Sequence, residues 1–322
     1  MLLYDDGLFL MRNRLGLDVR RPLPNGFISH AHFDHMAKHQ LVFCTPETAA
    51  LYKLRMGKRP FRLLPFQESV DYSGVKLTTY PAGHMLGSAM LLVEQGGVRV
   101  LYTGDFQLRA SLTCRQATIP RDVDILVMES TFGKPLYSFP DADESRSQLV
   151  NVVRGILLRG NCPIVEAYVA GKAQEITRIL SDAGIGVVQH PEVFAISRLY
   201  EELGSNIGHF QEYEGHPVPG AAIIVPPSEQ RGASIGDIYR QERVAVTGWA
   251  VRPDEARKRR VQHVVPLSDH ADYNELLKIV ELANPKIVLC THGPREFCDV
   301  LVSRGYDARY LHRDTAYCPL EQ

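Results

Sequence analysis

The sequence has 322 residues, 45% of them hydrophobic, so it is long enough to bury a core in one large domain or two ordinary ones. Its formal net charge is −1, which excludes a global electrostatic attraction to nucleic acid and leaves only local basic patches to hold such a partner. No apolar run approaches the roughly 18 residues of a membrane span, and the amino terminus is acidic where a signal peptide is basic. We therefore expect a cytoplasmic protein that has no membrane partner.

The cysteines carry no pairing signal. They contain no CxxC pair, and none lies inside the histidine-rich motif at residues 29–35. Reduced thiols are therefore expected, rather than disulfides or metal ligands. The six residues are Cys44, Cys114, Cys162, Cys290, Cys298 and Cys318.

In chain order, the first 28 residues alternate apolar and polar side chains, with turn signals at Asn13 and residues 22–26, and predict two short strands. Asp18 falls at the end of the second. A carboxylate at this position either orients a metal-bound imidazole, as ligating histidines usually require, or only forms the turn. The sequence is compatible with both interpretations.

The densest motif is Ser-His-Ala-His-Phe-Asp-His at residues 29–35, in which four metal-binding side chains fall within six positions. The preceding residues 25–28 are apolar and predict a strand, and residues 36–40 permit a helix. The motif is therefore expected where a strand ends, at an open edge of the fold.

Within this motif the spacing separates two pairs of ligands. In an extended segment, residues two apart point the same way, so His30 and His32 can hold one metal ion. Asp34 and His35, beyond the bend, can face a second ion. Imidazole and carboxylate without thiolate favour zinc, manganese or iron(II) in an open site.

Residues 46–57 predict a helix that begins at Pro46 and ends at Gly57. Basic side chains on and after this helix either contact phosphates or form a solvated face. They are Lys53, Arg55, Lys58, Arg59 and Arg62. Strands are then expected at 75–82, 89–94 and 98–104, in an antiparallel or mixed sheet.

Two further ligand candidates follow strands of this sheet. His84 lies in a glycine-flanked loop, and Asp105 comes directly after the strand ending in Thr-Gly. Either residue alone would usually be polar surface. Together with the first motif, His84 can complete the site of His30 and His32, and Asp105 can bridge that site to the second one.

The segment at residues 124–133 predicts an apolar strand that ends in Glu129 and is followed by a turn containing Ser130. From about residue 133, a polar loop and a long helical stretch introduce a new series of strand, turn and helix signals. We interpret this series as a second α/β unit inserted into the first. A basic cluster at residues 252–260 lies where the chain leaves this unit. Its side chains either contact phosphates or form a solvated helix end.

Inside the inserted unit, Gly171 and Lys172 stand at the start of a predicted helix. Backbone amides, the helix dipole and the ammonium group there favour a phosphate contact, although a plain capping turn explains the pattern equally well. The glycine spacing is not that of a P-loop. Ser130 and Ser268 complete the candidate phosphate-binding set.

Two more histidines follow strands near the carboxyl end, His270 after residues 264–267 and His292 after residues 286–290. Acidic and imidazole groups from several apolar strands thus meet at one edge of the sheet. The other six histidines have no such setting and are expected on the surface or in the core.

At this point a resemblance to a known family is evident. The His-x-His-x-Asp-His motif, with Asp18, His84 and Asp105, resembles the motif set of the metallo-β-lactamase fold. Glu129, His270 and His292 match the additional motifs of the β-CASP nucleases in type, order and context. The segments Ala-Tyr-Val-Ala-Gly-Lys-Ala-Gln-Glu, Thr-Gly-Trp-Ala-Val-Arg-Pro, Ser-Asp-His-Ala-Asp and Thr-His-Gly are most similar to the ligase-associated DNA exonucleases and mRNA 3′-end processing exonucleases, an Artemis-like branch.

The resemblance implies an α/β protein with a four-layer αββα metallo-β-lactamase fold and an inserted α/β β-CASP domain. It divides the chain into residues 1–132, the first part of the metallo-β-lactamase domain, 133–262, the β-CASP insertion, and 263–322, the second part. The active site is expected in the cleft between these domains.

The resemblance also implies two divalent metal ions, Zn²⁺ in preference to Mn²⁺, sharing a bridging hydroxide that attacks phosphorus. Its motifs assign His30, His32 and His84 to one ion. Asp34, His35 and His292 fall to the other, and Asp105 bridges the two. His270 would act as general acid or hold the phosphate, and Glu129 would orient it.

The expected function is hydrolysis of single-stranded DNA, as an exonuclease with 5′ to 3′ polarity in DNA repair, in association with DNA ligase or other repair proteins. His292 keeps RNA end processing as the alternative, because the last motif of the Artemis-like DNA enzymes usually carries Val there. A small-molecule hydrolase of the lactamase or glyoxalase type would not need Glu129, His270 or the insertion. An inactive binding subunit would have lost ligands, and no expected ligand is missing here.

Overall fold

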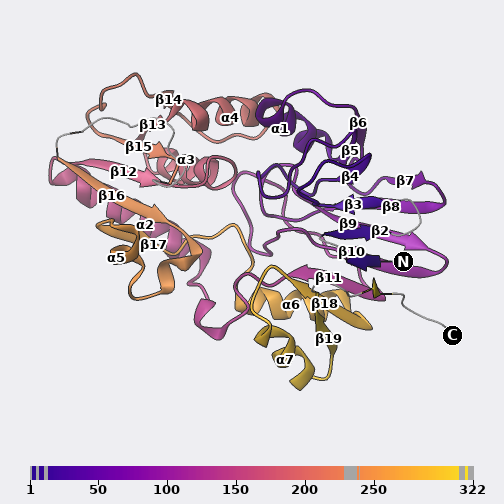
Figure 1. Cartoon of the computed structure of the whole chain (residues 1–322). Helices are drawn as coiled ribbons and strands as arrows, with labels where there is room; N and C mark the ends of the chain where they lie inside the picture. Colours follow the sequence, from indigo (N-terminus) through magenta and orange to yellow (C-terminus); the bar gives the residue numbers. More distant parts are fainter. Residues whose placement is uncertain are drawn as a thin grey trace. The chain divides into compact units, whose positions relative to one another are not determined.

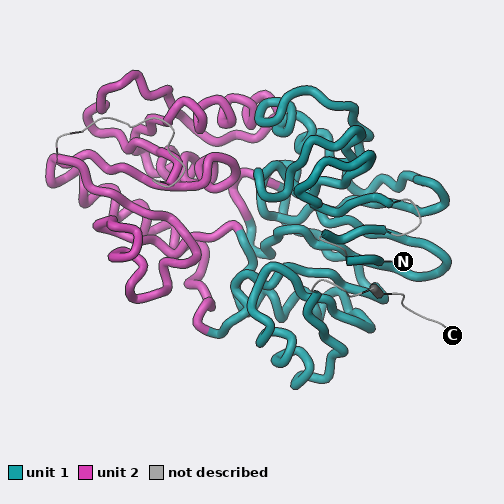
Figure 2. The backbone as a smooth tube through the Cα atoms, viewed as in Figure 1, with its two compact units in different colours: residues 1–110, 115–135, 270–322 teal, residues 111–114, 136–269 magenta. Residues whose placement is uncertain are grey.

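The computed structural model describes residues 2–4, 7–10, 14–227, 238, 240–311 and 316–317. They form two compact units, shown in Figure 2. Unit 1 comprises residues 1–110, 115–135 and 270–322, and unit 2 comprises residues 111–114 and 136–269. The turn signal at Asn13, together with Cys318 and His312, lies outside the described residues.

The boundaries of unit 2 differ from the expected insertion at 133–262. Strand β17 (His263–Val265), which the sequence assigned to the returning segment, pairs in parallel with β16 (Gln241–Val246) in the sheet of unit 2. Residues 111–114 also join unit 2, because the Ser111 hydroxyl and the Leu112 amide donate to Glu175, over 2.7 and 2.9 Å. A local strand signal could not reveal which sheet the strand joins.

Unit 1 contains two seven-stranded sheets, visible in Figure 1. The first has the order β20-β1-β2-β3-β4-β5-β6, with strands β1 (Leu2–Tyr4), β2 (Leu8–Leu10), β3 (Leu15–Leu17), β4 (Asn25–Phe27), β5 (Leu41–Cys44), β6 (Phe61–Leu63) and β20 (Ala316–Tyr317). The second has the order β19-β18-β11-β10-β9-β8-β7, with strands β7 (Ser69–Tyr72), β8 (Val75–Pro81), β9 (Ala89–Gln95), β10 (Val98–Tyr102), β11 (Ile125–Glu129), β18 (Ile287–Thr291) and β19 (Asp307–Tyr310). Three short strands, rather than the two predicted, precede β4.

The two sheets pack face to face, and helices cover their outer sides. One apolar core joins residues of both sheets, for example Phe43 of β5 and Leu91 of β9. A second core joins the other face of the second sheet to helices α6 (Tyr273–Ala283) and α7 (Glu296–Ser303). Helix α1 (Pro46–Met56) lies beside β6 in the first sheet, with its Tyr52 ring 5.6 Å from the Phe61 ring. These layers confirm the αββα architecture expected from the sequence.

Strand β9 explains the continuous apolar run at residues 89–93. Leu91 and Val93 enter the core between the sheets, whereas Met90 and Leu92 enter the core below the helices. Successive side chains of a strand point to opposite faces, so a strand that is covered on both sides reads as uniformly apolar. β9 pairs antiparallel with β8 and β10, and β10 pairs parallel with β11, which confirms the predicted mixed sheet.

Unit 2 is built on a six-stranded sheet in which every pairing is parallel, with the order β14-β13-β15-β12-β16-β17. Its remaining strands are β12 (Cys162–Glu166), β13 (Gly186–Gln189), β14 (Gln211–Glu212) and β15 (Ala221–Val225). Its helices are α2 (Ala142–Leu158), α3 (Lys172–Asp182), α4 (Pro191–Glu202) and α5 (Glu255–Arg259). Apolar residues of α2 and α3 pack on this sheet in one core. No helix in the described part of the chain has the length and apolar character to cross a bilayer.

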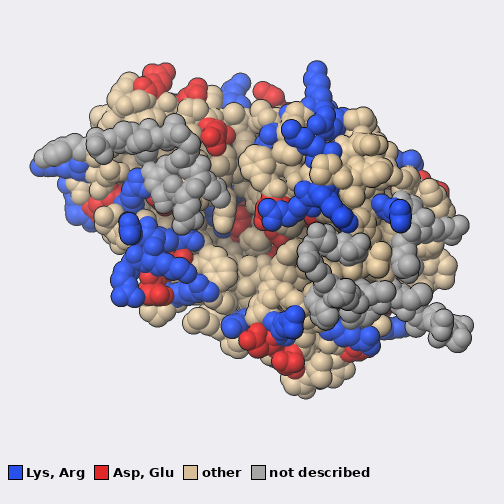
Figure 3. Space-filling model, in the orientation of Figure 1, with Lys and Arg blue, Asp and Glu red and all other residues tan. Residues whose placement is uncertain are grey.

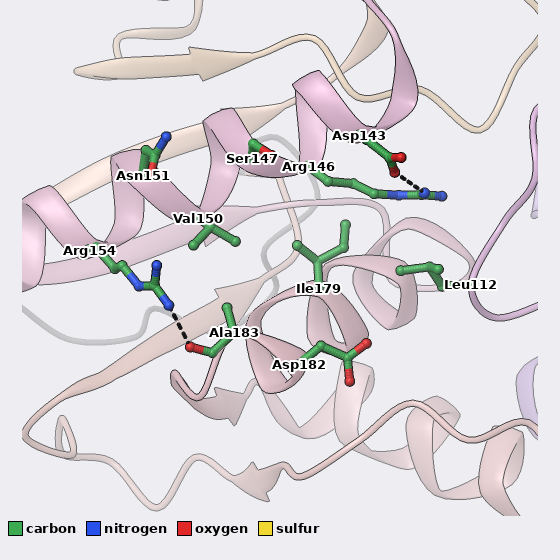
Figure 4. Close-up of a pocket in the computed structure, with 10 residues that line it drawn as sticks. All are labelled: Leu112, Asp143, Arg146, Ser147, Val150, Asn151, Arg154, Ile179, Asp182 and Ala183. Atoms are coloured by element: carbon green, nitrogen blue, oxygen red, sulfur yellow. Dashed lines mark hydrogen bonds and ion pairs between the residues drawn. The ribbon is translucent and has the colours of Figure 1, made fainter.

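Two features of unit 2 bear on its surface and stability. Helices α2 and α3 border a groove of about 530 Å³, in which Arg154 donates to the Ala183 carbonyl oxygen over 2.8 Å, as Figure 4 shows. None of the residues lining this groove belongs to the predicted site.

On β16, hydrogen bonds from Arg159, His263 and Asn161 lower the pKa of the Glu242 carboxyl to about 2.

Candidate metal centre

The loop after β4 presents the histidine-rich motif. Ile28 extends β4 by donating to the Phe43 carbonyl oxygen, and a turn follows in which the His35 amide donates to the His32 carbonyl oxygen over 3.1 Å. The helix that the sequence permitted at residues 36–40 does not form. Instead the segment runs irregularly to β5, and the Ala37 carbonyl oxygen accepts hydrogen bonds from the His39 amide and the Tyr52 hydroxyl.

Four of the predicted ligands form one tight group. Ligand atoms of His30, His32, His84 and Asp105 all lie within 4.8 Å of one another. His84 Nε2 lies 3.2 Å from His32 Nδ1, and His30 Nε2 lies 3.6 Å from the Asp105 carboxylate. His30 is fully buried, yet its Nε2 atom has no hydrogen-bond partner among the described residues.

The lack of a hydrogen-bond partner for the buried His30 Nε2, among the described residues, indicates whether these side chains fit a metal ion. A buried polar atom normally has a hydrogen-bond partner, and one that points into a group of two further imidazoles and a carboxylate has the surroundings of a metal ligand. The set His30, His32, His84 and Asp105 therefore fits a divalent ion. This is the set that the sequence placed around the first metal.

The second predicted set is only partly assembled. His35 Nε2 lies 3.2 Å from the Asp105 carboxylate and 3.9 Å from that of Asp34, whose side chain is 68% exposed. The exposed His292 ring has its centroid 5.9 Å from that of His35. Among the described residues, neither Asp34 nor His292 belongs to a group as tight as the first. His35 and Asp105 are thus in contact, whereas Asp34 and His292 are exposed to solvent.

The Asp18 carboxylate contacts the His35 imidazole, as the interpretation of Asp18 as a ligand-orienting residue requires. Its carboxylate lies 2.9 Å from His35 Nδ1, which leaves Nε2 directed toward Asp105. Asp18 has a φ of +49° and accepts hydrogen bonds from the Ser29 amide, the Ser29 hydroxyl and the Tyr102 hydroxyl, over 2.7, 2.5 and 2.9 Å. Ser29 and Tyr102 were missed by the sequence analysis, since neither residue type signals a ligand-orienting role.

Close approach at the strand ends requires glycine at two positions. Gly104, just before Asp105, has a φ of +55°, and a Cβ atom there would lie 2.6 Å from Ser29. Gly293, just after His292, packs so closely on Ser130 that a Cβ atom would lie 1.9 Å from its carbonyl oxygen. The Thr-Gly-Asp and Thr-His-Gly motifs thus carry glycine for steric reasons.

Burial and neighbouring charges shift the pKa values of His30 and His35 in opposite directions. Burial and the neighbouring histidines hold the pKa of His30 well below its usual value, so its nitrogen is an unprotonated donor for a metal. Burial also disfavours a charged His35, but the carboxylates of Asp105 and Asp18 outweigh it and raise the pKa of His35 well above its usual value. Carboxylates that favour a proton at His35 also favour a metal cation in its place.

His270 and Glu129 form a second functional pair within unit 1. His270 Nδ1 lies 3.1 and 3.2 Å from the two Glu129 carboxylate oxygens. The buried Glu129 is fixed in turn by the Phe106 amide over 3.0 Å and by the Thr131 hydroxyl over 2.6 Å. His270 Nδ1 also lies 4.0 Å from Asp105, so the pair adjoins the metal ligands. The contact that an orienting role of Glu129 requires is present, and the role itself stays a prediction.

A strand precedes His270, as the sequence predicted. That strand, β17, belongs to the sheet of unit 2, and His270 itself lies in a loop of unit 1 before α6. A capping box of Asp272 and Glu275 begins α6, and Glu275 also accepts hydrogen bonds from the Leu108 and Arg109 amides over 3.0 and 2.6 Å. The Asp-Tyr-Asn-Glu spacing is the signal that could have revealed this anchor.

The proposed phosphate pocket at Gly171 and Lys172 is not supported by the geometry. Lys172 is 3% exposed, and its ammonium group pairs with Asp269 over 2.7 Å and donates to the Leu267 carbonyl oxygen over 3.2 Å. The Gly171 amide donates to the Gln174 side chain over 2.7 Å. Both donors are therefore used inside unit 2, as the plain capping alternative allowed.

The two serines of that set lie in different units. Ser130, in unit 1, is buried, and its hydroxyl donates to the Thr291 carbonyl oxygen over 3.1 Å. Ser268, in unit 2, is half-buried. A phosphate contact at Ser268 stays a prediction.

Basic side chains gather on both units, as Figure 3 shows over the regions of α1 with β6 and of α5. On unit 1, Lys53, Lys58 and Arg62 are exposed. On unit 2, the Arg252 guanidinium lies 4.3 Å from the centroid of the Trp249 ring, and Arg259 pairs with Glu255 on α5 over 2.5 Å. Some of these charges are thus engaged within the fold, whereas others are available to a polyanion.

The αββα sandwich with a histidine and aspartate cluster at its strand ends defines unit 1 as a metallo-β-lactamase fold with a hydrolase-type metal centre. The chain is similar, over part of their length, to proteins of the β-CASP branch of this fold. Residues 256–317 match the family described as "Zn-dependent metallo-hydrolase RNA specificity domain".

Similar proteins carry names from both DNA and RNA metabolism. A "Probable DNA ligase" of Opitutus terrae is 34% identical over 97% of this chain and 31% of its own length. "Endoribonuclease ysh-1" of Neurospora crassa is 31% identical over 48% of this chain and 22% of its own length. "Cleavage and polyadenylation specificity factor subunit 3-I" of Arabidopsis thaliana is 29% identical over 54% of this chain and 29% of its own length.

The chain therefore spans less than a third of the length of these relatives. Among solved structures, a protein of unknown function from Enterococcus faecalis matches with a TM-score of 0.56 and 18% identity, covering 89% of this chain and 79% of that one. At this identity the match supports the fold alone.

Proposed function

We propose that this chain is a metal-dependent nuclease that hydrolyses single-stranded DNA, as an exonuclease of 5′ to 3′ polarity in DNA repair. The observation that carries the proposal is the Glu129–His270 pair beside the group of His30, His32, His84 and Asp105. A hydrolase of small molecules needs the metal ligands but not a separately oriented imidazole next to them. The lactamase or glyoxalase type of activity is therefore the weakest candidate.

The ligand set favours Zn²⁺, with Mn²⁺ as the alternative, and two ions are proposed because Asp105 faces both His30 and His35. Ions held there would supply a water of lowered pKa and stabilise negative charge on the phosphoryl oxygens. His30 stays neutral through its burial, and Asp18 fixes the orientation of His35.

His270 is proposed to donate the proton to the leaving oxygen. The Glu129 carboxylate accepts from Nδ1, so the proton for the substrate has to come from Nε2. Glu129 is itself fixed by two further hydrogen bonds, so the imidazole is held in one orientation before substrate binds. With the P–O3′ bond broken and the 3′ oxygen taking this proton, cleavage would leave a 5′-phosphate on the product.

Two findings bear on the substrate. Nearly all of this chain matches part of a relative named as a DNA ligase, which supports DNA as substrate and an association with a ligase or other repair proteins. The RNA-specificity family match and the endoribonuclease relatives support RNA end processing as the second candidate, and His292 agrees with it. In the same reading, unit 1 is the metallo-β-lactamase domain and unit 2 is the β-CASP insertion.

The deciding experiment compares DNA and RNA strands of one sequence, each labelled at the 5′ or the 3′ end, with Zn²⁺ or Mn²⁺. Faster release of nucleotides from the 5′ end of DNA supports the proposal. Preference for RNA moves the function to the second candidate, and a ladder from the 3′ end reverses the polarity. Turnover of a chromogenic lactam or thioester without any cleavage of nucleic acid would refute the nuclease assignment, and His270→Ala serves as the matched control variant.

A further inference from the structure

An aromatic side chain is exposed in the middle of the metal-ligand loop. In the turn closed by the His35 amide and the His32 carbonyl oxygen, Phe33 and Asp34 occupy the two central positions, whose side chains face outward. Asp34 is a candidate metal ligand, whereas Phe33 has no group that could bind a metal. Phe33 is nevertheless 59% exposed.

Arg55 of α1 holds this ring in place. Its guanidinium carbon lies 3.9 Å from the centroid of Phe33, so the planar cation covers one face of the ring. The same side chain donates a hydrogen bond to the Ala31 carbonyl oxygen within the ligand loop. Because one face is covered and more than half of the side chain is still exposed, the open surface of Phe33 includes the opposite face.

The fold itself gives no reason for this arrangement. Among the described residues, Phe33 belongs to neither apolar core of unit 1. Its neighbours in sequence are His32 and Asp34, and consecutive Cα atoms lie about 3.8 Å apart. The ring is therefore an apolar surface fixed one residue from two candidate ligands.

Helix α1 carries a second contact of this kind. Lys53, two residues before Arg55, lies 5.3 Å from the centroid of the half-buried Phe61 ring. Aromatic faces combined with cations are the usual means of binding a single-stranded nucleic acid, because bases stack on the rings and cations follow the phosphates.

We infer that Phe33, held by Arg55, is a stacking platform for one base of a single-stranded nucleic acid whose phosphate lies at the metal ligands. The inference rests on the proposed nuclease function and adds a base-binding position to it. Stacking uses the π face that every base has, so the platform positions the strand without selecting a sequence. Phe33 is thus a positioning residue, and the ring takes no part in proton transfer.

The test measures binding and cleavage of two kinds of oligonucleotide, intact strands and strands with one abasic residue moved along the sequence. Phe33→Ala is compared with Phe33→Trp, which keeps a π face, and with the control Leu54→Ala, which removes an exposed apolar side chain on α1. Affinity is measured by fluorescence anisotropy, cleavage as KM and kcat, and metal content by elemental analysis.

Phe33→Ala should weaken the affinity for intact strands by roughly 5- to 150-fold, as expected for loss of one stacked base, with unchanged metal content. The loss should vanish when the abasic residue occupies the stacked position, and Phe33→Trp should restore affinity. The factor between wild type and Phe33→Ala should stay constant with salt, because stacking releases no counterions.

An equal loss for intact and abasic strands, no loss at all, or a loss of metal in Phe33→Ala would each overturn the platform. If the wild type cleaves neither DNA nor RNA, the proposed function fails, and the anisotropy measurement still decides the platform by itself. A wild type that binds no oligonucleotide overturns both.

Discussion

Replacing His270 by alanine tests the proton-transfer role most directly. The imidazole lies beside the metal ligands but outside the group of His30, His32, His84 and Asp105, so its removal should leave the first metal site intact. Loss of a positioned proton-transfer residue costs on the order of 10²- to 10⁴-fold in rate. We therefore expect His270→Ala to lower kcat by that factor at an unchanged metal content.

The role of Glu129 follows from the same geometry. In Glu129→Gln, the amide oxygen can still accept from the Phe106 amide, but the amide group has lost the charge that holds a proton on His270 Nδ1. Loss of the outer partner of a metal-ligating histidine typically costs about 10- to 100-fold in activity, and we expect a loss of the same order for the partner of His270. Since Glu129 acts through His270, its replacement should cost almost nothing more once His270 is alanine.

The assay is single-turnover cleavage of a labelled strand by wild type, both single variants and the double variant, together with elemental analysis and thermal unfolding. A double variant that equals His270→Ala supports one functional unit. Additive losses would mean that Glu129 acts separately, through Phe106 or Thr131. Loss of metal in His270→Ala would make His270 a ligand and refute the assignment.

Three further predictions concern the metal, the buried lysine and acid stability. Asp105→Asn and His32→Ala should each abolish cleavage and lower the bound metal. Far-ultraviolet circular dichroism should stay native, because both residues follow strands and lie outside the apolar cores. Near wild-type rates at saturating metal would refute the ligand set. Lys172→Met should lower the free energy of unfolding by about 3 to 5 kcal/mol in denaturant titrations, because it removes the cation that pairs with the buried Asp269. The ratio of the cleavage rates of 5′-phosphorylated and 5′-hydroxyl strands should be the same for this variant as for the wild type. The Glu242 carboxyl has a pKa of about 2 in the folded protein, below its unfolded value, so its contribution to stability is complete above pH 4.5 and is lost as pH falls toward 2. Denaturant unfolding of Glu242→Gln should show a weaker pH dependence over that range, and an unchanged profile would contradict the prediction.

Much of the centre is predictable because ligand chemistry is concentrated in short motifs. His30, His32, His84 and Asp105 each follow an apolar strand, and strand ends of one sandwich meet at a common edge, so their proximity follows from sequence pattern. The pairing of His270 with Glu129 was also inferred, although it joins residues far apart in the chain. In both cases residue type was informative because few folds have another use for such groups.

Other features depend on packing that no local pattern records. Ser29 and Tyr102 orient Asp18 through hydroxyl groups, which serve countless other roles in proteins. The sequence does not distinguish Phe33 from an ordinary apolar residue. Its exposure and its contact with Arg55, which are seen only in the structure, indicate a base-binding role. The sheet to which β17 belongs is likewise decided by its partner strand.

Lys172 shows why a helix start is an ambiguous signal. A glycine turn with a lysine at the first helical position has the composition of an anion site, because amides and ammonium both attract negative charge. In this chain the negative charge comes from Asp269 of the same unit, and the pair is buried. Asp269 directly precedes His270, so the ion pair fixes the chain one residue before the proposed proton donor. The same lysine can therefore matter for cleavage without touching a phosphate, and the Lys172→Met variant separates the two roles, since only a phosphate contact would make its effect depend on the end group of the substrate.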